Sequence, residues 1–230
     1  MPTTTSPFTK DLFHFLGELA LNNEREWFKE NQSRYEAHVR EPARAFIRAF
    51  APHLRKISKH LVANDAKVGG SLMRIHRDVR FGKDKTPYKT NLGIQFRHEA
   101  GKDVHAPGLY VHVEPDSIFL GAGMWQPDGP SLAAIRKTIV EKPSAWKRVT
   151  GEARFKRRWE FGGDSLKRAP RGFDPDHPLI EDLKRKSHIA TLELTPNAVS
   201  RRGFVEKVAE AFQEAKPYMR LLTKSQDLPF

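Results

Sequence analysis

Hydrophobic positions in the first sixty residues recur at the spacing of amphipathic helices. Leu12 and Leu16 share one helical face after Thr9, a residue type that often caps helix N-termini. Asn23 is followed three residues later by Glu26, a spacing that resembles a capping box and predicts the start of a second helix. These patterns predict at least two short helices at the beginning of the chain.

A third helix is predicted to begin at Pro42, because proline is favoured in the first turn of a helix. Pro52 lies inside its apolar stripe and is expected to kink or divide the helix. The segment before these helices, residues 1–8, is polar and predicts a flexible arm, which leaves 9–230 as one domain. The apolar stripe of the third helix has spacings of three and four residues and consists of Phe46, Phe50, Leu54, Ile57 and Leu61.

The middle of the chain changes to the period-two alternation of β-strands. Short connections between these strands favour antiparallel pairing, and helical spacing returns towards the C-terminus. The sequence therefore predicts a single α+β domain with a central, mainly antiparallel sheet and N- and C-terminal helices packed on one face. The predicted strands cover residues 71–77, 91–97, 109–114, 117–124, 157–161 and 189–194.

The alternation also divides the predicted sheet into two faces. One face is apolar and includes Met73 and Ile94, so we expect helices to cover it. The other face is polar, and two interpretations of it stay open. It is either a sheet face open to water, which antiparallel sheets tolerate, or the floor of a cleft. The residues that would then converge on an anion are Arg74, His76, Tyr110 and His112.

Composition restricts the chemistry and the partners of the chain. Its 230 residues contain no cysteine, which excludes disulfides and thiolate catalysis and suits a reducing cytoplasm. Neither a signal peptide nor an apolar segment of membrane-spanning length is present, so we expect a cytoplasmic protein without a membrane partner. The net charge of +12 and the isoelectric point near 9.9 favour anionic partners.

The densest cationic segment is R-I-H-R-D-V-R-F-G-K-D-K-T-P-Y-K at residues 74–89. Two aspartates cannot neutralise its six lysines and arginines, which favours binding of a small anionic or phosphorylated ligand. In the alternative interpretation the chain is a non-enzymatic interaction protein, and the segment is a structural brace held by ion pairs of Asp78 and Asp84 with basic neighbours. The candidate ligand-binding residues are Arg74, Arg77, Arg80, Lys83, Lys85, Tyr88 and Lys89. The candidate acid–base residues are His76, Asp78, Tyr110 and His112.

Motifs of other kinds of site do not occur. The sequence contains no phosphate-binding G-x-x-x-x-G-K-[ST], no H-E-x-x-H and no G-x-S-x-G. We therefore predict neither a cofactor nor a metal, and whether the chain is an enzyme stays open. A second basic tract, residues 147–171, contains interleaved aromatic residues and favours either a nucleic-acid-binding module or a solvated basic surface.

Several of these segments together resemble a known family. They are L-N-N-E-R-E-W-F at 21–28, the cationic segment at 74–89, G-L-Y-V-H-V-E-P at 108–115, G-A-G-M-W-Q-P at 121–127 and L-K-R-A-P-R-G-F at 166–173. The chain is identified as a member of a bacterial and fungal family known as a domain of unknown function of the 2461 type. The resemblance implies one α+β domain and supplies no catalytic residues.

Overall fold

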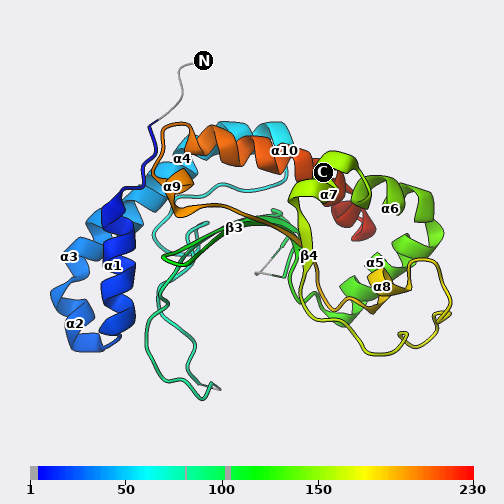
Figure 1. Ribbon diagram of the computed structural model, residues 1–230, viewed down its shortest axis with the longest axis horizontal. Coiled ribbons are helices and arrows are strands. Elements are labelled where there is room, and N and C mark those ends of the chain that lie inside the picture. Colours follow the sequence, from blue (N-terminus) through cyan, green and yellow to red (C-terminus); the bar gives the residue numbers. More distant parts are fainter. Residues whose placement is uncertain (1–4, 81, 102–104) are drawn as a thin grey trace.

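The computed structural model of the chain describes residues 5–80, 82–101 and 105–230 (Figure 1). Its sheet has five strands in the order β1-β2-β3-β5-β4, and each neighbouring pair is antiparallel. The predicted antiparallel sheet is therefore confirmed. The strands are β1 (Leu92–Arg97), β2 (Gly108–Glu114), β3 (Ser117–Met124), β4 (Glu160–Gly162) and β5 (His188–Glu193).

The N-terminal helices confirm one predicted cap and correct another. The Thr9 side chain accepts a hydrogen bond from the backbone N–H of Asp11, as expected for an N-cap. The predicted capping box at Asn23 does not form, because Glu24 occupies the N-cap position and the Asn23 side chain binds the backbone of Tyr88 instead. These helices are α1 (Lys10–Leu21), α2 (Arg25–Glu30), α3 (Gln32–Tyr35), the π-helical turn η1 (Glu36–Arg40) and α4 (Glu41–Ile57).

Helix α4 begins with Pro42 in its first turn, as predicted. It continues through Pro52 to Ile57, so the predicted division of this helix is wrong. Phe50 and Leu54 on either side of Pro52 are buried in the core, and this tertiary packing outweighs the local cost of an interior proline.

The strand predicted at 157–161 is present as β4, but it begins only at Glu160 and ends at Gly162. Glu152 accepts a hydrogen bond from the backbone N–H of Phe155 at 2.7 Å and so caps a short helix that continues to Arg158. Gly203, with φ of +84°, separates the two helices that follow Pro196. The helices are α5 (Gly129–Glu141), α6 (Pro143–Thr150), α7 (Ala153–Arg158), α8 (Ile180–Lys184), α9 (Pro196–Val199) and α10 (Phe204–Ser225).

Helices α4 and α10 cover one face of the sheet, as predicted, while the other face has no such cover (Figure 1). Phe50 of α4 lies 4.9 Å from Phe96 of β1 and 5.9 Å from Phe212 of α10, measured between ring centroids. Burial of each such ring contributes roughly 1.5–3 kcal/mol. The core therefore lies between these two helices and the apolar side of the sheet. No helix among the described residues has the length and apolar character needed to cross a bilayer.

The core also includes part of the segment predicted as a flexible arm. Phe8 is 1% exposed, and its ring centroid lies 5.5 Å from that of Phe46. The Ser6 hydroxyl donates a hydrogen bond to the carbonyl of Val199 at 2.6 Å. Residues 5–8 are thus held against the domain, and residues 1–4 of the predicted arm lie outside the described residues.

The predicted strand 71–77 is instead an extended segment that pairs with its neighbours only at isolated points. Leu72 lies opposite Ile94, and His76 lies opposite Tyr88. Because Leu72 takes the position opposite Ile94, Met73 faces the other side of the sheet and not the covered face predicted for it. This segment forms the border of the uncovered face beyond β1.

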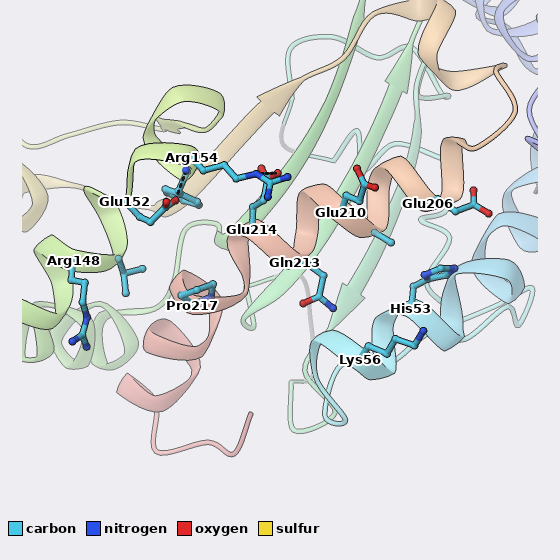
Figure 2. A pocket seen from close by; sticks show the side chains of 13 residues that line it. His53, Lys56, Arg148, Glu152, Arg154, Glu206, Glu210, Gln213, Glu214 and Pro217 are labelled. Carbon is cyan, nitrogen blue, oxygen red and sulfur yellow. Dashed lines mark hydrogen bonds and ion pairs between the residues drawn. The ribbon is translucent and has the colours of Figure 1, made fainter. Parts of the chain in front are cut away.

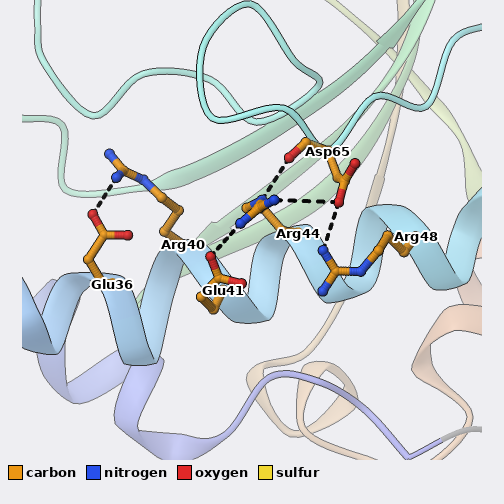
Figure 3. A network of polar contacts seen from close by, with 6 residues as sticks. All are labelled: Glu36, Arg40, Glu41, Arg44, Arg48 and Asp65. Carbon is orange, nitrogen blue, oxygen red and sulfur yellow. Dashed lines mark hydrogen bonds and ion pairs between the residues drawn. The ribbon is translucent and has the colours of Figure 1, made fainter.

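A network of ion pairs fixes the loop that leads into this segment (Figure 3). The Asp65 carboxylate binds Arg48 at 2.7 Å and Arg44 at 3.7 Å, and the Asp65 carbonyl accepts from Arg44 Nε at 2.7 Å. Both arginines project from α4. The network therefore ties the connection between α4 and the edge of the sheet to a helix of the core.

Candidate functional site

The uncovered face of the sheet carries a cleft of about 490 Å³. Its floor includes Tyr110 and His112 from β2, Phe119 and Gly121 from β3, and Thr191 from β5. These residues share a face because side chains alternate along a strand and because the register places Gly121 between Tyr110 and Thr191. The structure thus brings together two of the four predicted acid–base candidates, Tyr110 and His112.

Three side chains of β2 form a chain of polar contacts along one side of this cleft. The Tyr110 hydroxyl lies 3.2 Å from His112 Nδ1, and His112 Nε2 lies 3.4 Å from the Glu114 carboxylate. Thr90 donates to the same carboxylate at 2.7 Å. An ionised Glu114 can only accept, so His112 Nε2 carries the proton and Nδ1 is free to accept from Tyr110. This arrangement suits transfer of a proton through His112.

Burial keeps both Tyr110 and His112 uncharged. It lowers the pKa of His112, although the Glu114 carboxylate opposes this effect. Burial also raises the pKa of Tyr110 to about 12. The imidazole of His112 stacks on Phe119 with ring centroids 4.5 Å apart and planes inclined by 13°. At neutral pH this part of the cleft is therefore aromatic, polar and without net positive charge.

Two residues that the sequence analysis did not select lie at the rim of the cleft. Trp125, which directly follows β3, is 46% exposed, and Met73 lines the cleft from the β1 edge. The alternating G-A-G at residues 121–123 was a signal of an open floor, because glycine inside a strand often marks a close approach of another molecule. No comparable sequence pattern indicated that Trp125 and Met73 lie at the rim.

The outer part of the cationic segment 74–89, residues 77–86, contains ion pairs and hydrogen bonds between its own residues. Arg77 donates to Asp84 and Thr86, and Arg80 donates to Asp78 at 2.9 and 2.7 Å. A hydrogen bond from the backbone N–H of Thr86, followed by the bond from Arg77, lowers the pKa of Asp84 to about 2. Bonds from Arg80 similarly lower the pKa of Asp78 to about 2. Asp78 thus binds its own loop and does not line the cleft.

His76 does not share the face of Tyr110 and His112 that the alternation predicted for it. It lies opposite Tyr88 within the segment 74–89. Its ring centroid lies 5.2 Å from that of Tyr88 and 6.4 Å from that of Phe28. Tyr88 is 6% exposed and stacks on Phe28 with ring centroids 4.1 Å apart. Aromatic packing against α2 therefore determines where both side chains lie, and both are outside the cleft lining.

The base of the cationic segment, formed by Arg74 and Lys89, differs from the outer part in its ion pairs. Within the described part of the chain, neither Arg74 nor Lys89 forms an ion pair, and the same holds for exposed Lys83. Lys85 donates to the carbonyl of Val79 at 2.8 Å. Partial burial, followed by the charge of Arg74, lowers the pKa of Lys89. Arg74 and Lys89 are thus two neighbouring cations without a carboxylate partner.

A larger groove of about 800 Å³ lies between α4, α10 and the α6–α7 region (Figure 2). Its lining carries charges of both signs, and several of them pair with each other. Glu214, whose side chain is 5% exposed, accepts from Arg154 at 2.8 Å and from Arg158 at 2.6 Å. These pairs use two of the cations that a nucleic acid would need.

The aromatic residues of the basic tract 147–171 also turn inward. Phe155 and Trp159 are each 2% exposed, and their rings are stacked 5.9 Å apart. They pack in the core because the helical spacing of α7 places both on its inner side. Neither ring is accessible to a nucleic-acid base. Among the described residues, no group of three or more His, Asp and Glu could hold a metal ion.

The comparisons with known proteins identify a family and no activity. No curated protein matches the chain. The family described as conserved hypothetical protein (DUF2461) matches residues 11–221, a range that contains the whole sheet and every cleft residue named above. The resemblance inferred from the segments around 74–89 and 108–127 is therefore confirmed, and the chain belongs to the DUF2461 family.

Proposed function

We propose that the chain binds a small ligand that carries an anionic group, such as a phosphate, at the cleft on the uncovered face of the sheet. The carrying observation is the cleft itself, whose volume of about 490 Å³ falls within the range of about 300–1,000 Å³ typical of small-molecule sites. Its aromatic walls and its few polar groups around His112 also fit such a site.

The anionic group is supported by Arg74 and Lys89. Arg74 is exposed and directly follows Met73, which lines the cleft. The charge of Arg74 contributes to the lowered pKa of Lys89, and an anion beside the two cations would relieve their repulsion. Guanidinium and ammonium groups are the usual partners of phosphate oxygens in proteins.

This proposal divides the cationic segment into two parts with different roles. Arg77, Arg80 and Lys85 have partners inside the loop, which supports a bracing role for the outer part. Arg74 and Lys89 at the base of the segment are the cations that we assign to the ligand. Tyr110 and His112 then supply hydrogen bonds, and the contact of His112 with Glu114 allows a proton to be exchanged with the ligand.

A nucleic acid is less well supported as the partner. Stacking on bases is a main source of affinity for single strands, and Phe155 and Trp159 are buried. Exposed cations such as Lys156 and Arg157 remain on the tract, and a binding experiment with a short oligonucleotide separates the two interpretations.

The test is a thermal-shift and calorimetric titration with inorganic phosphate, ribose 5-phosphate, nucleoside monophosphates and a short single-stranded DNA. Lys89→Met is compared with Lys83→Met, which removes an exposed cation from the outer part of the same segment. We expect a phosphorylated compound to raise the melting temperature of the wild type, because a ligand stabilises the state that binds it. Lys89→Met should weaken this binding about tenfold, which corresponds to about 1.4 kcal/mol.

Two results would contradict the proposal. One is that none of the small phosphorylated compounds binds. The other is that Lys89→Met and Lys83→Met bind the same compound as tightly as the wild type. Binding of the oligonucleotide alone would favour the nucleic-acid interpretation instead.

A further inference from the structure

Two glycines in the floor of the cleft are not required by the backbone. Gly121 and Gly162 both lie inside strands, and neither has a positive φ. A Cβ added at Gly121 would lie 3.4 Å from Tyr110 Cβ, and one added at Gly162 would lie 3.7 Å from Ile189 Cδ1, which are ordinary contacts. Glycine weakens a strand relative to residues with side chains. Glycine at these two positions therefore leaves open space above the sheet.

Gly123 shows the contrasting case. Its φ is +139°, and an added Cβ would lie 2.0 Å from the carbonyl oxygen of His188, so its backbone requires glycine. It pairs with Gly108 on one side and Ile189 on the other. Together, Gly121 and Gly123 of β3 and Gly108 of β2 leave a strip without side chains, while Ile189 of β5 separates this strip from Gly162.

Flat aromatic surfaces border this strip. Phe119 stacked on His112 lies beside Gly121 on β3, while Trp125 lies at the end of that strand. The Trp125 ring is close to Gly163, where an added Cβ would lie 4.0 Å from Cζ3. A tryptophan that is 46% exposed at the rim of a cleft presents a large flat surface for stacking.

The lining of the cleft contains no lysine, arginine, aspartate or glutamate among the described residues. The part of a ligand that enters it is therefore uncharged. The hydroxyl groups of Tyr110 and Thr191 face the same space and match hydrogen-bonding atoms at the edge of a ring.

We infer that the cleft accommodates a planar, uncharged heteroaromatic ring, which lies on the glycine strip between Trp125 and the stacked pair of Phe119 and His112. This inference rests on the proposed function and specifies the uncharged part of the same ligand. A ring in this position stacks with Trp125, and its edge donates hydrogen bonds to the hydroxyl oxygens of Tyr110 and Thr191, whose own protons bind His112 and the Glu160 carbonyl. The anionic group attached to it extends towards Arg74 and Lys89.

The experiment titrates the full chain with the uncharged compounds adenosine, uridine and riboflavin, and in parallel with ribose 5-phosphate, which has an anion without an aromatic ring. Binding is measured by calorimetry and by quenching of tryptophan fluorescence. Gly121→Val fills the floor beside Tyr110, and Ser117→Val, which places the same side chain at an exposed position of β3 outside the cleft lining, is the matched control. Trp125→Phe identifies the fluorescence that responds.

We expect at least one uncharged ring compound to bind and to quench a signal that Trp125→Phe lacks. Gly121→Val should weaken this binding at least tenfold, while Ser117→Val changes it less than threefold. The melting temperature of Gly121→Val should equal or exceed that of the wild type, because valine favours strands. If Gly121→Val does not fold, Gly162→Ala provides the same comparison with a smaller side chain.

The outcomes separate this inference from the proposed function. Binding of ribose 5-phosphate that depends on Lys89, without binding of any ring compound, overturns the inference and leaves the proposed function standing. Ring binding that Gly121→Val does not weaken also overturns it. Ring binding that is blocked by Gly121→Val, without any binding of ribose 5-phosphate, supports the inference and counts against the anionic group.

Discussion

Asn23 binds the backbone of Tyr88 through both polar atoms of its side chain. Its Nδ2 donates to the Tyr88 carbonyl, and its Oδ1 accepts from the Tyr88 N–H, each at 3.0 Å. The two residues are 65 positions apart. This amide therefore holds the start of α2 against the base of the cationic segment, one residue before Lys89.

Replacing Asn23 by alanine should destabilise the fold by about 1–3 kcal/mol, because it leaves the N–H and C=O of a buried tyrosine without their partner. Asn22→Ala is the matched control. Its side chain binds only the exposed carbonyl of Glu18, and we expect a cost of about 0.5 kcal/mol or less. Urea denaturation of both variants measures the difference, and equal costs would show that the contact with Tyr88 contributes nothing.

Asn23 also shows where reasoning from sequence fails. The spacing from Asn23 to Glu26 fits a capping box, and the true partner, Tyr88, is far away in the sequence and gives no local signal. The alternation in β2 was informative because Leu109, Val111 and Val113 are buried while Tyr110, His112 and Glu114 are only half-buried, so period two follows directly from burial. Local sequence patterns thus predicted the helices and strands, but they could not predict side-chain contacts between residues far apart in the sequence.

The same distinction applies to the candidate site. Tyr110 and His112 were predicted to share a face because they are two residues apart on one strand. Gly121 and Thr191 meet only through the register of β3 with β5, which joins residues 70 apart. The face of Met73 was predicted wrongly because the segment pairs through Leu72 with Ile94 and forms no regular strand. The residues that separate strands contribute to the cleft floor could therefore be identified only from the structure.

The internal pairs of the cationic segment predict a difference between its arginines. Arg80 pairs with its near neighbour Asp78, and its side chain is 74% exposed, so loss of this ion pair in Arg80→Ala should leave the melting temperature nearly unchanged. Arg77, which is 35% exposed, links Asp84 and Thr86 across the loop. Arg77→Ala should therefore speed amide hydrogen exchange in the loop without changing exchange in the sheet. Equal rates of amide hydrogen exchange in the loop of Arg77→Ala and Arg80→Ala would contradict a bracing role for Arg77.

The contact between His112 and Glu114 predicts a tautomer and a change in pKa. Nitrogen NMR should show a neutral ring with the proton on Nε2. The Glu114 carboxylate favours the protonated ring, so Glu114→Gln should lower the pKa of His112 further. Glu193→Gln removes the same charge from β5, opposite Phe119, and should change the pKa much less. A proton on Nδ1 in the wild type would exclude the proposed route from Tyr110 through His112.

Buried His188 predicts a loss of stability in mild acid. The side chain is fully buried beside Trp146, with ring centroids 5.6 Å apart, and neither ring nitrogen has a hydrogen-bond partner among the described residues. Burial, followed by the charges of Arg185 and Arg136, lowers its pKa from 6.5 to about 3. Between these values the unfolded chain binds a proton that the folded chain does not. Stability is therefore complete above pH 6.5 and falls as the pH falls towards 3.

Lowering the pH from 7.5 to 5 should thus cost the wild type about 2 kcal/mol through His188 alone. His188→Phe keeps a ring against Trp146 and removes the titrating group, so urea denaturation should show a shallower pH dependence by this amount. His14→Gln, at an exposed position of α1, is the control and should retain the wild-type dependence. The lowered pKa of His112 acts in the same direction in all three proteins, so the difference between them isolates His188. An unchanged pH dependence in His188→Phe would mean that water or a polar partner reaches the ring in the folded protein.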